Sequence, residues 1–240
     1  MTSNKNNIFI IISSIVCDTK YPLDYCSTRS IFSANERFSQ TLRTISSIRD
    51  KNSECEILLI DNTPVPTEWV TRLESKCEYS LFTYENNGLD QELNDFLKNY
   101  PNKGHSECSM MLQALYFLSK NCSKNFNLYF KISGRYYLND KFNLDNFDLD
   151  KYTFKKNSDF GYGLFTTLYS VPHILLDNFF YHTLYSFSVT SNALPPHLGY
   201  SLESNFLSKE ADEDYNNMIK FIDTLGIEGN IGPSGELHSH

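Results

Sequence analysis

Two cationic residues bracket a short turn near the middle of the chain. The segment KISGRY covers residues 131–136, and within it Lys131 and Arg135 flank a Ser-Gly pair. The segment ends an apolar run that is typical of a buried strand, and ligands of open α/β sheets bind beyond the carboxyl ends of the strands. Two neighbouring buried cations are costly unless an anion or a carboxylate compensates them. Two interpretations are therefore open: a diphosphate binds here, or one or both cations pair inside the protein with Asp61, Glu107 or Asp140.

The segment NKGHSE, residues 102–107, is a second candidate for an anion site. It comes just before a predicted helix, where free amide groups and a glycine let an anion approach the backbone and where Lys103 adds a charge. It is not a P-loop, because the GxxxxGK spacing is absent. The alternative is an ordinary capped helix start with Lys103 in solvent.

Polar residues also follow the other predicted strands. A loop arginine can hold a phosphate through its forked guanidinium, and a strand-end aspartate can accept hydrogen bonds from a ribose or a base. Arg29 follows the first predicted strand and Asp61 follows the second. The full set of candidate ligand-binding residues is Arg29, Asp61, Lys103, Gly104, Glu107, Lys131, Ser133, Gly134, Arg135 and Tyr136.

These residues can meet only if a sheet brings its strand ends to one edge. Strand-like and helix-like segments alternate in the first half of the chain, which favours βαβ units and an α/β fold with a mainly parallel central sheet flanked by helices. Ser33 and Glu36 form a capping box at the start of the first helix. Strands are expected at 7–16, 56–60, 79–84 and 126–132, and helices at 34–49, 66–76, 89–97 and 106–120.

The second half of the chain shows different patterns. Aromatic and β-branched residues dominate 159–189, where two or three antiparallel or irregular strands are expected. Helices are expected at 202–209 and 212–225. The tail, 227–240, is rich in Gly, Ser and Pro, and offers Glu228 and Glu236 as residues of a flexible lid.

Composition narrows the class of protein. Of the 240 residues, 40% are hydrophobic and 21% are charged, which is typical of a globular domain. The formal net charge of -8 disfavours a nucleic-acid partner, which needs clustered Lys and Arg. The longest apolar run, 8–12, is too short for a transmembrane segment and the N-terminal segment is a poor signal peptide, so a cytoplasmic location is expected. The six cysteines lack a CxxC spacing and are expected to be free thiols.

Five segments taken together resemble a known family. They are TRSIFSANERFSQTLRTISSIR (28–49), ILLIDNT (57–63), KGHSE (103–107), YFKISGRYYL (129–138) and IEGNIGPSGE (227–236). In this order they are similar to glycosyltransferases of the GT-A type, which resemble WavE-like surface-polysaccharide enzymes and relatives in large viruses. The resemblance implies a GT-A-like, Rossmann-related fold and transfer of a sugar from a nucleotide-sugar donor to a glycan or glycoconjugate acceptor. It assigns the candidate residues above to the donor. On this interpretation residues 1–240 form one domain, with a nucleotide-binding half at about 1–140 and an acceptor-side half at about 141–240.

The chain departs from that family at the metal site. GT-A enzymes usually place a DxD motif after the central strand to hold a divalent cation against the diphosphate. The corresponding stretch here reads SGRYYLND, so no metal ligand is assigned and the use of Mn²⁺ or Mg²⁺ stays open. Lys131, Arg135 and Lys103 are expected to neutralise the diphosphate instead. The acidic run DNFDLD, 145–150, is a weaker metal candidate.

An inverting transferase also needs a base that takes the acceptor proton. Glu203 is the first candidate and His197 the second, although a glutamate in the first turn of a helix is equally explained by the helix dipole. A retaining enzyme needs no such base. Two other functions stay open: a catalytically silent nucleotide- or carbohydrate-binding protein of the same fold, and a nucleotidyltransferase, which needs acidic pairs for magnesium.

Overall fold

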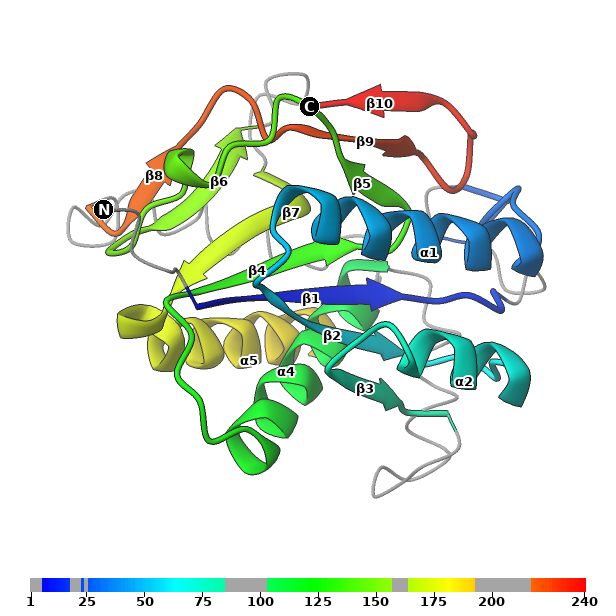
Figure 1. Ribbon diagram of the computed structural model, residues 1–240, viewed down its shortest axis with the longest axis horizontal. Coiled ribbons are helices and arrows are strands. Elements are labelled where there is room, and N and C mark those ends of the chain that lie inside the picture. The colour runs from blue at the N-terminus through cyan, green and yellow to red at the C-terminus, as the bar shows by residue number, and fades with distance from the viewer. Residues whose placement is uncertain (1–5, 18–22, 24–25, 85–102, 157–163, 193–216) are drawn as a thin grey trace.

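A seven-stranded sheet forms the centre of the protein (Figure 1). The structure is a computed structural model that describes residues 6–17, 23, 26–84, 103–156, 164–192 and 217–240. The strand order is β3-β2-β1-β4-β7-β6-β8, and every neighbouring pair is parallel except the two that include β7. The expected α/β class, with a mainly parallel sheet flanked by helices, is confirmed. The strands are β1 (Asn7–Ser13), β2 (Glu56–Asp61), β3 (Tyr79–Phe82), β4 (Leu128–Ser133), β6 (Tyr152–Lys156), β7 (Leu164–Pro172) and β8 (Ile219–Phe221).

Helices cover both faces of this sheet. On one face lie α1 (Ala34–Lys51) and α2 (Thr67–Glu74), and on the other lie α4 (Lys103–Asn121) and α5 (Leu176–Asn192) (Figure 1). Two short 3₁₀ helices, η1 (Leu144–Asn146) and η3 (His173–Leu175), complete the helical elements of the described residues. The predicted capping box of α1 is present: the Ser33 hydroxyl accepts from the Glu36 amide, and Glu36 accepts from the Ser33 amide at 2.8 Å.

The central strand β1 shows why its sequence is almost continuously apolar. Successive side chains of a strand point to opposite faces, and both faces of this sheet are covered. Ile8 and Ile10 pack in the core beneath α4 and α5, whereas Phe9 and Ile11 pack in the core beneath α1. All four side chains are fully buried.

A second, smaller sheet stands beside α1. It has the order β10-β9-β5 and consists of β5 (Tyr136–Leu138), β9 (Ile227–Asn230) and β10 (Leu237–Ser239). The tail expected to be a flexible lid is therefore paired with the strand that follows the KISGRY turn. Within it, Glu228 accepts a hydrogen bond from the Tyr137 hydroxyl, which fixes this carboxylate in the sheet.

Two expectations for the second half of the chain are wrong. The segment 176–192 is helical instead of extended, because Phe179, Thr183 and Ser186 recur at helical spacing and are buried together. The segment 219–221 is a strand instead of part of a helix. Ile219 packs in the core beneath α4 and Leu225 in the core beneath α1, on opposite faces of the sheet, which one face of a helix could not achieve.

Several other expectations have a simpler outcome. The Lys103–Glu107 stretch, expected just before a helix, is part of α4. All six cysteines are free thiols, as expected. Within the described ranges, no helix combines the length and apolar character needed to cross a membrane. The helices expected at 89–97 and 202–209 lie outside the described residues.

Candidate anion-binding cleft

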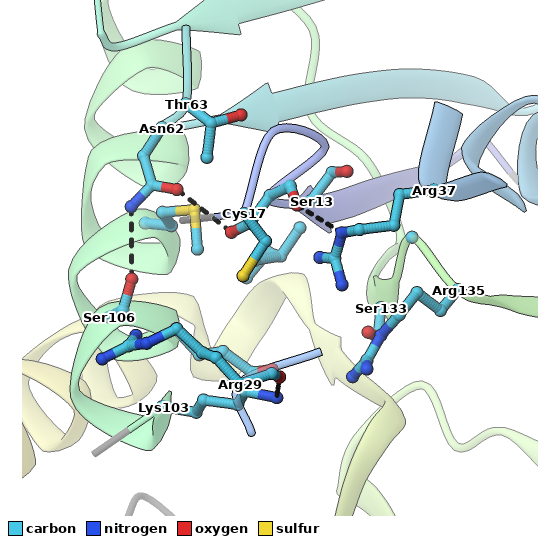
Figure 2. Close-up of a pocket in the computed structure, with 15 residues that line it drawn as sticks. Ser13, Cys17, Arg29, Arg37, Asn62, Thr63, Lys103, Ser106, Ser133 and Arg135 are labelled. Carbon is cyan, nitrogen blue, oxygen red and sulfur yellow. Dashed lines mark hydrogen bonds between the residues drawn. The ribbon is translucent and has the colours of Figure 1, made fainter. Parts of the chain in front are cut away.

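A cleft opens where β1, β2 and β4 end (Figure 2). The strand order places β2 on one side of β1 and β4 on the other, so the chain changes direction across the sheet at this point, where open α/β sheets bind ligands. The cleft contains about 710 Å³ of space, and this volume includes open solvent. Four cationic side chains of the described residues line it: Arg29, Arg37, Lys103 and Arg135.

Arg37 brings a buried guanidinium into the cleft from α1. Its Nε donates to the Ser14 carbonyl at 2.6 Å and its Nη1 donates to the Ser30 hydroxyl at 3.2 Å. Burial lowers the pKa of Arg37 to about 10, and the charge of Arg135 acts in the same direction. Arg37 is therefore still charged at neutral pH, and its position is fixed by the loops after β1 and before α1.

Lys103 and Arg29 approach from the opposite side (Figure 2). Lys103 is the first residue of α4, and its Nζ donates to the backbone carbonyl of Arg29 at 2.8 Å. This bond ties the start of α4 to the loop before α1. Burial lowers the pKa of Lys103 to about 7, with Arg135 and Arg37 as the next largest causes. An anion in the cleft would favour the charged form of this lysine.

Arg135 belongs to the turn between β4 and β5. Its Nη1 is buried and has no hydrogen-bond partner among the described residues. The turn fits tightly against β1 and α1, since a Cβ at Gly134 would stand 3.1 Å from the Cβ of Ser13 and 3.3 Å from the Thr41 hydroxyl. The Gly134 amide also donates to the Ile12 carbonyl at 2.9 Å. A rigid turn thus holds a guanidinium whose donors are not all used by the protein.

The tail covers this guanidinium. Gly232 lies so close that a Cβ there would be 2.0 Å from Nη1 of Arg135 and 3.2 Å from Nζ of Lys103. Its carbonyl accepts from the Ile31 amide at 2.9 Å, which attaches the tail to the loop before α1. Any larger residue at this position would displace Arg135.

Asp61 lies beneath the cleft and does not line it. Its carboxylate is fully buried and accepts from the amides of Ile15 and Thr63, each at 2.8 Å, and from the Thr63 hydroxyl. Burial raises the pKa of Asp61, and these hydrogen bonds oppose that rise. In this arrangement its oxygens are directed to the protein backbone, so a bound ribose or base has no access to them.

Lys131 also differs from its expected environment. It is 2% exposed, and its Nζ donates to Glu107 Oε2 at 2.9 Å and to the Thr166 carbonyl at 2.5 Å. Two interpretations of the KISGRY cations were open: pairing inside the protein or contact with a diphosphate. Lys131 is paired inside the protein with Glu107, whereas Arg135 lines the cleft. Lys131, Gly104 and Glu107 line a smaller adjacent cavity.

The remaining predicted residues are divided between the cleft and its surroundings. Ser133 and Gly134 line the cleft, and Glu107 lines both cavities. Tyr136 is buried in the core beneath α1. Glu203 and His197, the candidate bases, lie outside the described residues.

A divalent cation does not fit the described part of the cleft. Mn²⁺ and Mg²⁺ prefer several oxygen ligands, chiefly carboxylates. Glu107 is the carboxylate that lines the cleft in the described ranges, and Lys131 already holds it. Among the described residues, no three or more His, Cys, Asp or Glu side chains are grouped so that they could hold a metal ion. The aspartates of the run 145–150 do not form such a group either.

Sequence reasoning missed Arg37, and a signal for it was present. Arg37, Thr41 and Thr44 recur at helical spacing next to the apolar stripe of α1, and all three are buried. A stripe of buried polar side chains indicates that this face of the helix contacts backbone groups or a ligand instead of aliphatic side chains of the core. It also missed the link between Asn62 and Ser106, in which the amide donates to the hydroxyl at 3.3 Å and joins the end of β2 to α4.

Anion binding should weaken as the pH rises. Lys103 has a pKa of about 7 without ligand, so above that pH the lysine must take up a proton when an anion binds to its charged form. We expect the affinity for sulfate, which does not titrate in this range, to fall by up to about tenfold per pH unit between pH 7 and 8.5. Isothermal titration at a series of pH values measures this.

Two variants separate Lys103 from the other groups that face it, which are Arg135, Arg37, Cys17 and Glu107. Lys103→Arg should bind sulfate with little pH dependence, because arginine stays charged throughout. Cys17→Ser should retain the wild-type slope. A flat wild-type profile, or a slope that disappears in Cys17→Ser, would contradict the assignment to Lys103.

The fold and the cleft together define an α/β protein with a cationic cleft at the carboxyl edge of its sheet. Neither a protein-family model nor a curated protein sequence matches the chain. Among solved structures, it is similar to a glycosyltransferase involved in the glycosylation of the major capsid of PBCV-1, with 12% identity over 91% of this chain and 83% of that chain and a TM-score of 0.45. It is also similar to the glycosyltransferase GlyE of Streptococcus pneumoniae TIGR4, with 10% identity over 91% of this chain and 45% of that chain and a TM-score of 0.49. A third is core-mannan synthase A of Aspergillus fumigatus in an Mn/GDP form, with 12% identity over 94% of this chain and 74% of that chain and a TM-score of 0.47.

Proposed function

We propose that this chain is a glycosyltransferase that transfers a sugar from a nucleotide-sugar donor to a glycan or glycoconjugate acceptor. The observation that carries the proposal is the convergence of Arg29, Arg37, Lys103 and Arg135 on one cleft at the switch point of the sheet. Such a concentration of positive charge, with donors held by backbone contacts, suits a diphosphate. The sequence segments that resemble GT-A enzymes contribute all four residues, which supports a nucleotide-sugar in particular.

The cations would act mainly on the leaving group. When the acceptor hydroxyl attacks the anomeric carbon, the bond to the phosphate oxygen breaks and the nucleoside diphosphate leaves with the electron pair. The hydroxyl proton passes to a general base or to the leaving phosphate. Fixed donors aimed at that developing charge lower the barrier more than mobile water can. In this proposal Arg37, Arg135 and the charged form of Lys103 take the place that a metal ion occupies in enzymes with a DxD motif.

One observation favours a second candidate, a catalytically silent nucleotide-binding protein of the same fold. The described cleft has a single carboxylate, which is paired with Lys131, so no unpaired carboxylate lines the described part of the cleft. Turnover of donor distinguishes this candidate from the enzyme. A nucleotidyltransferase is less compatible with the cleft, because it needs paired carboxylates for magnesium near the phosphates.

A thermal-shift screen tests the proposal. UDP-, GDP-, CMP- and dTDP-sugars are added singly, each with Mn²⁺ and with EDTA. We expect at least one nucleotide-sugar to stabilise the protein in EDTA, by ~2.7 kcal/mol at ~100 times its dissociation constant. No stabilisation by any donor would refute the proposal. Stabilisation and turnover that both require Mn²⁺ would leave the transferase standing and refute the cationic substitute for the metal.

A further inference from the structure

Glu107 stands out in the cleft because of its charge. It lies near the start of α4, and it is the carboxylate among the described residues that line the cleft, where the other charged groups are cations. Its side chain is 32% exposed, whereas Asp61 is fully buried. A ligand that enters the cleft therefore meets one negative group on a positive surface.

Lys131 fixes the orientation of this carboxylate. The buried ammonium holds Oε2 at 2.9 Å and is itself held by the Thr166 carbonyl at 2.5 Å. A buried lysine must keep its acceptors, so the pair resists rotation. Among the described residues, Lys131 is the hydrogen-bond partner of the Glu107 side chain, so the second carboxylate oxygen keeps its capacity to accept a hydrogen bond.

The charges also determine which part of a ligand can lie near Glu107. Phosphates are repelled by a carboxylate and attracted by Arg37 and Arg135. Hydroxyl groups, by contrast, donate to a carboxylate readily, and hydrogen bonds to charged groups are the stronger ones. Glu107 also lines the smaller cavity next to the cleft, together with Lys131, Thr166 and Tyr169.

We propose that Glu107 is a specificity-determining residue that accepts hydrogen bonds from the sugar hydroxyls of the donor and directs the diphosphate toward the arginines. This inference rests on the proposed function, because it needs a donor with a sugar and a diphosphate. It differs from a role in binding the phosphates themselves, because a carboxylate opposes that binding.

The experiment compares ligands with and without the sugar. UDP and UDP-glucose, GDP and GDP-mannose, and dTDP and dTDP-glucose are each titrated calorimetrically into the wild type and into Glu107→Gln. For the base that binds, we expect Glu107→Gln to bind the free nucleoside diphosphate as well as the wild type or more tightly, since a repulsive charge is gone. We expect it to bind the nucleotide-sugar at least about tenfold more weakly, since a charge-assisted acceptor becomes a neutral one.

Two further variants keep the result interpretable. Glu54→Gln removes a carboxylate from the exposed loop between α1 and β2 and should leave both affinities unchanged. Glu107→Asp keeps the charge but withdraws it by one methylene, and should lose part of the preference for the nucleotide-sugar. It also serves as the test variant if the amide at position 107 fails to support Lys131 and the protein unfolds.

The outcomes are distinct. Equal changes in the affinity for the nucleotide and the nucleotide-sugar, or no change in either, would overturn the assignment of Glu107 and leave the proposed function intact. Loss of both affinities in Glu107→Gln would also overturn it, by showing that the residue acts through the fold. Failure of the wild type to bind any of the six ligands would overturn a donor with one of these diphosphates, and this inference with it, whereas the proposed function as a whole is refuted only if the thermal-shift screen also finds no donor.

Discussion

Replacing Arg135 with alanine is expected to weaken nucleotide binding by about 10- to 100-fold. The guanidinium stands on a rigid turn at the end of β4, and its Nη1 has no protein partner among the described residues. Charge-assisted hydrogen bonds from such a group contribute about 1.5 to 3 kcal/mol each, and 1.4 kcal/mol corresponds to a factor of ten in affinity. Calorimetric titration with the nucleotide that stabilises the wild type measures the change.

The controls for Arg135 separate charge from geometry. Arg135→Lys keeps the charge and loses the forked donor, so it should fall between the wild type and the alanine variant. Arg72→Ala removes an exposed arginine of α2 and should leave the affinity unchanged. If Arg135→Ala binds as tightly as the wild type while remaining folded, the turn does not hold the phosphates.

Replacing Asp61 with alanine is expected to lower the free energy of unfolding by about 2 to 4 kcal/mol. The substitution leaves the buried amides of Ile15 and Thr63 without acceptors, and each unsatisfied buried group costs about 1 to 3 kcal/mol. A second effect opposes this. Because the folded-state pKa of Asp61 is raised, ionising it destabilises the folded state once the pH exceeds the usual aspartate range, and alanine removes that cost. We expect the loss of two backbone partners and the Thr63 hydroxyl to outweigh it at neutral pH.

Denaturant unfolding of Asp61→Ala and Asp61→Asn checks this balance. The asparagine removes the charge but keeps one acceptor oxygen, so its stability should be intermediate. Asp140→Ala, which removes an exposed partner of Lys51, should leave the unfolding free energy nearly unchanged. An alanine variant at position 61 as stable as the wild type would show that the charge dominates over its hydrogen bonds.

The strands and helices that the structure describes in the first half of the chain could be predicted, because apolar runs, capping residues and turn formers recur there. The second half could not. In 176–192 the aromatic residues are common in strands, yet the burial of Phe179 in the core beneath α4 depends on the tertiary packing of α5 against α4. At Ile219 the deciding fact is a strand partner in β6, which lies far away in the sequence.

The candidate site shows the same division. The position of the KISGRY turn at the end of a strand could be predicted from the apolar run before it, and that of Lys103 near the start of a helix could be predicted from the helical spacing that follows it. The role of Lys131 could not be predicted, although the face of the sheet on which it lies could. Because side chains alternate along a strand, Lys131 lies on the same face as Tyr129, toward α4, and Phe130 lies on the other face. The sequence alone does not show that the Glu107 side chain of α4 lies next to Lys131. That contact decides whether Lys131 binds a ligand or pairs with a carboxylate inside the protein.

The position of Gly232 has a consequence for how the cleft is assembled. This residue of the tail lies against Arg135 and Lys103, and it is bonded to Ile31 from the other end of the chain. Closing a contact across some two hundred residues is slow, because the loop entropy must be overcome before the contact forms. During synthesis the four cations can gather as soon as α4 and β4 have formed, but their cover arrives only when Gly232 has left the ribosome. Until then Arg135 lacks the cover that Gly232 provides.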